Sequence, residues 1–162
     1  MSCGPKDKKF DNCVCEVVRA IKDIQDNAVE DECLDCTTNC FLEPLGGLNS
    51  PVRRHKADTR VFTLSLPNGE LFKGLFRRRL DDHPCVGGFS PFFRVEEVFD
   101  NCCATLRVLV PVGDYDHDGD LEVAKDFCKI DGFVRTDNCI TVDLDCFCAV
   151  QCIADVNLRI CD

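Results

Sequence analysis

Apolar residues recur every three or four positions in the segment from Cys13 to Glu32. They are Val14, Val17, Val18, Ile21, Ile24 and Ala28, with charged residues between them and neither glycine nor proline in the segment. This spacing places the apolar side chains on one face of an α-helix. We therefore predict one amphipathic helix over about 13–32, with Asp11 or Asn12 as its N-cap.

Beyond Arg60 the apolar positions alternate with polar ones, and turn residues separate the alternating segments. Asn68-Gly69, Asp100-Asn101 and Asp137-Asn138 each lie between two such segments, which predicts antiparallel hairpins. Pro111 is expected to end its strand or to restrict it to a sheet edge. The segments predicted to pair are 61–66 with 71–76, 92–98 with 104–110, and the residues around Val134 with a long strand from Cys139 to Ile153.

The predicted strand at 139–153 carries thiols in phase with its apolar residues. One face would hold Ile140, Val142, Leu144, Cys146, Cys148, Val150 and Cys152. We predict a mainly β fold: an antiparallel β-sandwich or jelly-roll-like domain over 58–162, with an N-terminal amphipathic α-helix. Residues 1–57 would form an N-terminal arm, the helix and a Cys-rich hinge.

The cysteine content is unusual for a chain of this size. There are 15 cysteines in 162 residues, although a domain of this length can bury a core without covalent staples. The N-terminal residues lack the apolar stretch of a secretory signal, which predicts synthesis in a reducing cytosol. The thiols would then bind metal, be buried as small apolar groups, or oxidise later, and the odd number favours bonds between molecules.

We divide the cysteines by their place in the predicted fold. Those near the termini and in the hinge are the candidates for intermolecular disulfides: Cys3, Cys13, Cys15, Cys33, Cys36, Cys40 and Cys161. Those in predicted strands and turns are interpreted as core-facing or intramolecular: Cys102, Cys103, Cys139, Cys146, Cys148 and Cys152.

Two segments are candidate metal sites, and the first of them is also a candidate redox site. Zinc-knuckle spacing is found at Cys33, Cys36 and Cys40, but His55 is the one candidate for a fourth zinc ligand. A thioredoxin-type redox site lies at a helix N-terminus, whereas this cluster follows the C-terminus of the predicted helix. The loop at 114–122 opens like an EF-hand, yet Lys125 stands where the twelfth-position glutamate is required. A solvated acidic turn is favoured over weak calcium binding; the candidate ligands are Asp114, Asp116, Asp118 and Asp120. We expect no cofactor, with calcium or zinc as weak alternatives.

The formal net charge of −10 disfavours nucleic acid and anionic membrane surfaces as partners. Two basic clusters, 53–56 and 77–79, could instead contact acidic loops of neighbouring copies and favour self-association. No nucleophile constellation or phosphate-binding glycine motif is present, so we do not expect an enzyme.

Several segments together resemble the CotY/CotZ spore coat family, whose exosporium relative is ExsY. They are Met1-Ser2-Cys3, Cys13-Val14-Cys15, 92–96, 103–106 and, most specific, 139–152. The resemblance extends over nearly the whole chain, although the Asp-rich loop at 114–120 and the arginines at 77–79 match no family feature.

The resemblance implies a structural protein of the outermost endospore layer, either the crust or the exosporium basal layer. Such proteins are made in the mother cell without a signal peptide and assemble into homo-oligomers, here expected to be hexameric, and into two-dimensional lattices hardened by disulfides. Other coat or exosporium proteins are the further partners implied. A zinc-binding adaptor module and a thiol-disulfide oxidoreductase are the alternatives.

Overall fold

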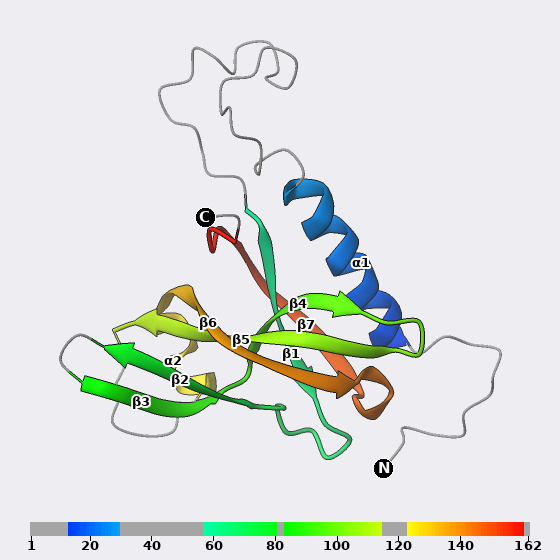
Figure 1. The fold of residues 1–162 in the computed structure, drawn as a ribbon. Coiled ribbons are helices and arrows are strands. Elements are labelled where there is room, and N and C mark those ends of the chain that lie inside the picture. The colour runs from blue at the N-terminus through cyan, green and yellow to red at the C-terminus, as the bar shows by residue number, and fades with distance from the viewer. Residues whose placement is uncertain (1–12, 30–56, 81–82, 115–122, 161–162) are drawn as a thin grey trace, which may run out of the picture.

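The computed structural model describes residues 13–29, 57–80, 83–114 and 123–160. The predicted class, a mainly antiparallel β fold with an N-terminal amphipathic α-helix, is confirmed (Figure 1). In chain order the elements are α1 (Cys13–Val29), β1 (Thr59–Ser65), β2 (Gly74–Leu80), β3 (His83–Ser90), β4 (Phe92–Val98), β5 (Cys103–Gly113), α2 (Val123–Asp126), η2 (Phe127–Lys129), β6 (Ile130–Asp143), η3 (Leu144–Cys146) and β7 (Ala149–Val156).

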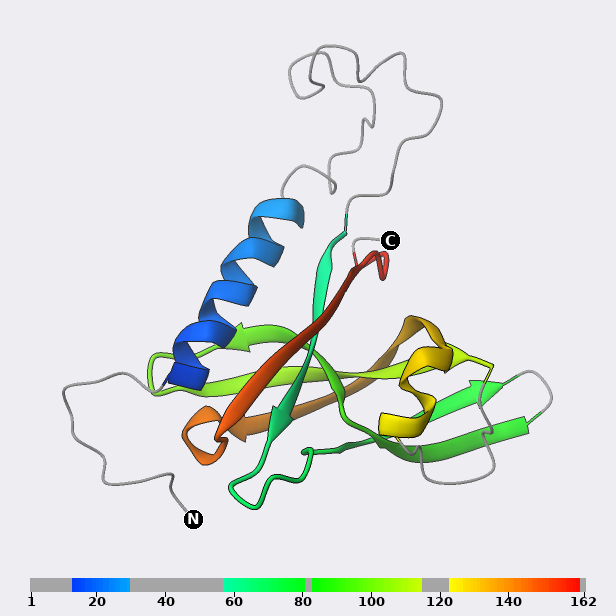
Figure 2. The same ribbon diagram turned by 180° about the vertical axis from the view of Figure 1, so that it is seen from behind.

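The strands form two antiparallel sheets. The larger has the order β6-β5-β4-β1-β7, so its edge strands are β6 and β7. The smaller is the two-stranded ribbon β2-β3, which extends away from the larger sheet at the end opposite α1 (Figure 2). The ribbon is inserted in the chain between β1 and β4, which are neighbours in the larger sheet.

Helix α1 covers one face of the larger sheet and completes the main core. Val14, Val18 and Ile21 are at most 4% exposed and belong to the same cluster as Phe62 and Phe93. The predicted helix is confirmed over 13–29; residues 30–32 and the proposed N-caps lie outside the described residues. The buried stripe follows the spacing 14, 18, 21, 25, which turns position 24 toward solvent.

Ile24 was expected in the core, and this was wrong: it is 49% exposed, while Gln25 is 2% exposed. The Gln25 side chain joins the helix to two strands, since Nε2 donates to the Val95 carbonyl at 2.9 Å and Oε1 accepts from the Arg60 backbone N–H at 3.0 Å. A buried amide with both groups paired is stable where an unpaired one would not be. The helix is therefore held in one orientation on the sheet.

The other face of the larger sheet has a smaller core of Val61, Phe92, Leu109 and Leu158. A charged network lies nearby: Arg94, 5% exposed, pairs with Glu96 at 2.9 Å, and Glu96 also accepts from Arg107 at 2.6 Å. Arg94 Nε donates to Thr59 Oγ1 at 2.9 Å as well. The burial of Arg94 is thus compensated by charge and hydrogen bonds.

The turn at Asn68-Gly69 was predicted correctly, but the hairpin around it was not. Gly69 has φ +85°, a backbone conformation that favours glycine, and Leu66 N–H donates to the Glu70 carbonyl at 2.8 Å. After one bridge between Ser65 and Leu71, however, the chain leaves β1 and β2 pairs with β3. Both edges of β1 are occupied by β4 and β7, so β2 has no place beside it.

Asp137-Asn138 forms a bulge rather than the predicted turn. The register of β5 with β6 shifts from Arg107↔Cys139 to Leu109↔Arg135, so the strand absorbs the additional residues and continues. Thr136 Oγ1 donates to the Val108 carbonyl at 2.6 Å within this bulge. A long partner strand, β5, allows β6 to run on to Asp143.

The second hairpin, β4 with β5, is confirmed, but Pro111 does not end its strand. β5 continues to Gly113 with Pro111 opposite Phe133 of β6, in a region where the pairing with β4 has already ended at Leu109.

The predicted single strand 139–153 is interrupted by η3. Asp143 accepts a hydrogen bond from the Asp145 backbone N–H at 2.9 Å at the start of this turn, and β7 begins only at Ala149.

Candidate cross-linking cysteines

One disulfide joins the helix to the sheet inside the chain. Cys15 and Cys102 are bonded with their Cα atoms 5.7 Å apart, and Cys15 is 1% exposed. The assignment of Cys15 to an intermolecular bond was therefore wrong, because its side chain lies on the buried face of α1. Cys102 was expected to be core-facing or intramolecular, and it lies in the turn between β4 and β5 with φ +64°.

Six free thiols are exposed within the described residues, each in a different element or turn. They are Cys13, Cys85, Cys128, Cys139, Cys146 and Cys152. Cys103 is partly buried, and Cys148 is exposed and disulfide-bonded. Cys139, Cys146 and Cys152 were expected to be core-facing or intramolecular, and this was wrong, because all three are exposed and free. Cys139 and Cys152 lie on the edge strands, and Cys146 lies in the η3 turn. Cys148, placed in the same class, is exposed rather than core-facing, but it is disulfide-bonded.

The exposed thiols lie where another molecule can reach them. Cys139 and Cys152 are on β6 and β7, the two edge strands of the larger sheet, whereas Cys85 is on the ribbon and Cys13 begins α1. Edge strands are common sites of contact between chains. Since none of these thiols is bonded inside the chain, each is available for an intermolecular bond.

One of the exposed thiols, that of Cys139, is partly desolvated. Partial desolvation raises the pKa of Cys139; Arg107 opposes this rise, while Glu96 and Asp137 add to it. Because the thiolate is the attacking species in disulfide exchange, the raised pKa makes Cys139 slower to react at neutral pH than an ordinary cysteine would be.

Cys85 and Cys128 were missed by the sequence analysis. Cys85 lies four residues before Phe89, so strand alternation would have placed both on one face, yet the segment 83–90 was not recognised as a strand. Cys128 lies in the short turn η2, for which no periodic signal exists.

The remaining predicted residues fall outside the described residues. These are Cys3, Cys33, Cys36, Cys40, Cys161, Asp116, Asp118 and Asp120. Asp114 is exposed just beyond β5. Within the part of the chain that the structure describes, no group of three His, Cys, Asp or Glu side chains could hold a metal ion, and no helix is long and apolar enough to span a membrane.

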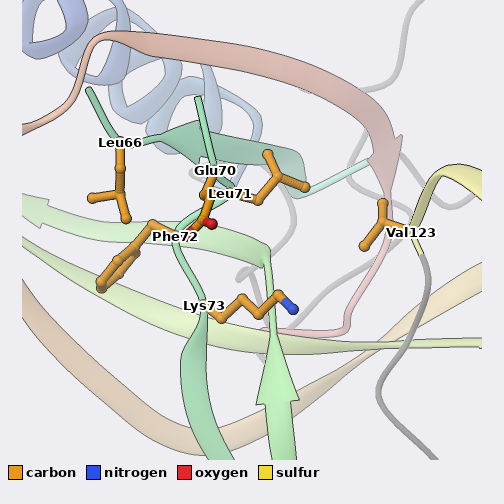
Figure 3. Close-up of a pocket in the computed structure, with 6 residues that line it drawn as sticks. All are labelled: Leu66, Glu70, Leu71, Phe72, Lys73 and Val123. Atoms are coloured by element: carbon orange, nitrogen blue, oxygen red, sulfur yellow. The ribbon is translucent and has the colours of Figure 1, made fainter. Parts of the chain in front are cut away.

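A pocket lies between the 66–73 loop and α2 (Figure 3). Four of its lining side chains are apolar, and Glu70 and Lys73 are its charged groups. The lining contains no thiol, hydroxyl or imidazole group.

These features define a small antiparallel β protein that closes its own fold with an internal disulfide and presents free thiols on its surface. The spore coat protein Z family model matches residues 1–155, and the chain belongs to this family. Spore coat protein Z of Bacillus subtilis (strain 168) is 35% identical over 147 residues, which cover 90% of this chain and 91% of that protein. No solved structure matches the chain. Family membership supports a structural role in the spore coat, at the spore surface.

Proposed function

We propose that this protein assembles with itself into ring oligomers and a disulfide-linked two-dimensional lattice in the outermost spore layer. The observation that carries the proposal is the set of six exposed free thiols, distributed over both edge strands, the ribbon and the helix. A fold that needed cysteines only for its own stability would bury or pair them. The resemblance to coat proteins that form hexagonal lattices supports a hexameric ring, and other coat proteins are further partners.

A cysteine-rich chain made in a reducing cytosol can still form disulfides if oxidation follows synthesis. Thiols stay reduced in the mother-cell cytosol and cross-link after assembly, when a low-molecular-weight disulfide or dioxygen can act as oxidant. With a disulfide as oxidant, one protein thiolate attacks it and releases one small thiol; a second protein thiolate then displaces the other small thiol from the mixed disulfide. Two protein thiols are oxidised to one disulfide, and the reagent is reduced to two thiols.

The test compares the natural chain with a variant in which the six exposed thiols are serine. After oxidation, the natural chain should give sheets in electron microscopy and a ladder of multimers on a non-reducing gel that collapses to monomer with reductant. The variant should lose most of the ladder while keeping its circular dichroism spectrum. An equal ladder from the variant would contradict the assignment, and a monomeric protein with stoichiometric zinc would support the adaptor alternative instead.

A further inference from the structure

The outer face of the β2-β3 ribbon combines apolar, basic and thiol groups. We call this the ribbon face; its exposed residues are Leu75, Arg77, Arg79, Cys85, Gly87 and Phe89. Leu75 and Phe89 lie directly opposite each other in the register and are 63% and 57% exposed. Phe76, on the inner face, packs over Gly88 and against the main core instead.

The ribbon face is positively charged. Its residues include two arginines, Arg77 and Arg79, and no aspartate or glutamate; Asp81 and Asp82 lie outside the described residues. A chain of net charge −10 thus concentrates arginine beside an exposed apolar pair. Paired exposed Leu and Phe on a strand ribbon are typical of a contact surface rather than of a solvated face.

The outer side of α1 has the complementary composition. We call it the helix stripe; its residues are Cys13, Glu16, Ala20, Asp23, Ile24 and Asn27, at the spacing of one helix face and opposite the buried side. Ile24 is 49% exposed. Lys22 is occupied by Asp26 at 2.6 Å, and Arg19 donates to the Phe99 carbonyl at 2.9 Å.

Glu16 and Asp23 are therefore the charges that the stripe presents outward, and neither has an ion-pair partner among the described residues. Each surface thus holds exposed apolar area, one sign of charge and one exposed free thiol.

The two surfaces also match in length and order. Along the helix, Cys13 and Ile24 are separated by about 16 Å at 1.5 Å per residue. Along the ribbon, Cys85 and Phe89 are separated by about 13 Å at 3.3 Å per residue. With the thiols side by side, Glu16 would lie between Arg79 and Arg77. Asp23 and Ile24 would lie level with the Leu75–Phe89 pair, toward which the long Arg77 side chain would extend from the neighbouring position.

These surfaces lie at opposite ends of the molecule in both views (Figure 1, Figure 2), so one copy cannot join them. The helix end is held firmly, by the Cys15–Cys102 bond and by Gln25. A contact between two different surfaces of the same chain is heterologous, and it builds closed rings or open chains according to the angle between copies.

We propose that the helix stripe of one copy docks on the ribbon face of the next, and that Cys13 and Cys85 then form a disulfide across this contact. This inference rests on the proposed function and specifies its contact. The noncovalent contact is small and hence weak, and the bond makes it persistent. The oxidant is a low-molecular-weight disulfide, reduced to two thiols as the two protein thiols are oxidised.

The first experiment mixes equal amounts of natural full-length chain with its ¹⁵N-labelled form, oxidises the mixture with a low-molecular-weight disulfide and identifies linked peptides by mass spectrometry. Cys13–Cys85 links should be abundant, and about half of them should join one light and one heavy peptide. Absence of this link from a sample that still forms a ladder would overturn the inference and leave the proposed function intact. Absence of any ladder would overturn both.

A charge exchange tests the docking itself. The double variant R77E/R79E should form the Cys13–Cys85 link about tenfold more slowly at low salt, as should E16R/D23R, since each loses two ion pairs at a partly exposed surface. Mixing the two double variants should restore the rate, because the reversed face then meets the reversed stripe. Lys129→Glu on η2 is the matched control and should leave the rate unchanged. Equal rates in all variants would refute electrostatic docking between these surfaces.

Discussion

Replacing Cys102 with serine separates the folding role of the cysteines from cross-linking. The Cys15–Cys102 bond closes a loop with a sequence separation of 87. For a loop of this size the chain-entropy relation predicts about 4.6 kcal/mol, and native disulfides typically contribute about 2–5 kcal/mol. Cys15, 1% exposed, would remain as a small apolar group and leave no cavity. We therefore expect the free energy of unfolding to fall by about 2–4 kcal/mol.

Urea unfolding followed by far-UV circular dichroism measures this change, since the chain has no tryptophan to report by fluorescence. Exposed thiols are alkylated beforehand so that every sample is monomeric. The matched control is Cys13→Ser, two residues away on the same helix but exposed and free, for which a change within about 0.5 kcal/mol is expected. An unchanged midpoint for Cys102→Ser, or an equal loss for Cys13→Ser, would refute the assignment of the bond.

Three further predictions concern single contacts. The hydrogen bond from Arg60 holds the pKa of Asp155 below its ordinary 3.8, so its stabilisation is present above that value and is lost as the pH falls through the lower folded pKa. Asp155→Asn should cost at most about 0.5 kcal/mol in urea unfolding at pH 7, and the cost should shrink as the pH is lowered below 3.8. Cys139, whose pKa is raised, should need a higher pH than free cysteine for half-maximal alkylation, measured by mass spectrometry. Gly74→Ala should lose about 1–3 kcal/mol in thermal melting, because its Cβ would lie 2.7 Å from buried Val108.

The elements with local signals were predictable from the sequence. The period of α1 and the alternation of β4 and β5 depend on neighbours a few residues apart, and all three elements were found where expected. The partners of β1 were not predictable, because β4 and β7 reach it from about 30 and 90 residues along the chain. A tight turn at Gly69 was visible in the sequence, whereas the competition for the edges of β1 was not.

The orientation of the C-terminal thiols shows how far alternation can be extended. Val142, Leu144 and Val150 all belong to the main core or pack against it, although η3 interrupts the strand between them. Leu144 is fully buried at this turn, while Cys146 and Cys152 are exposed. Alternation indicates which face a side chain is on but not whether it is buried: Cys152 lies opposite core residue Phe62, yet it is exposed because β7 is an edge strand.

The described chain holds α1 against the core with one disulfide and has six exposed free thiols, which bears on the order in which bonds would form. If the chain is made in a reducing cytosol, as proposed, the Cys15–Cys102 bond would be open there, and α1 would be held by its buried apolar residues, by the paired amide of Gln25 and by Arg19. The oxidation proposed to link copies through exposed thiols would then close this bond inside each copy. Stability of the subunit and permanence of the assembly would thus rise together. A reduced subunit, still able to reorient and exchange, can correct its contacts before either kind of bond makes them permanent.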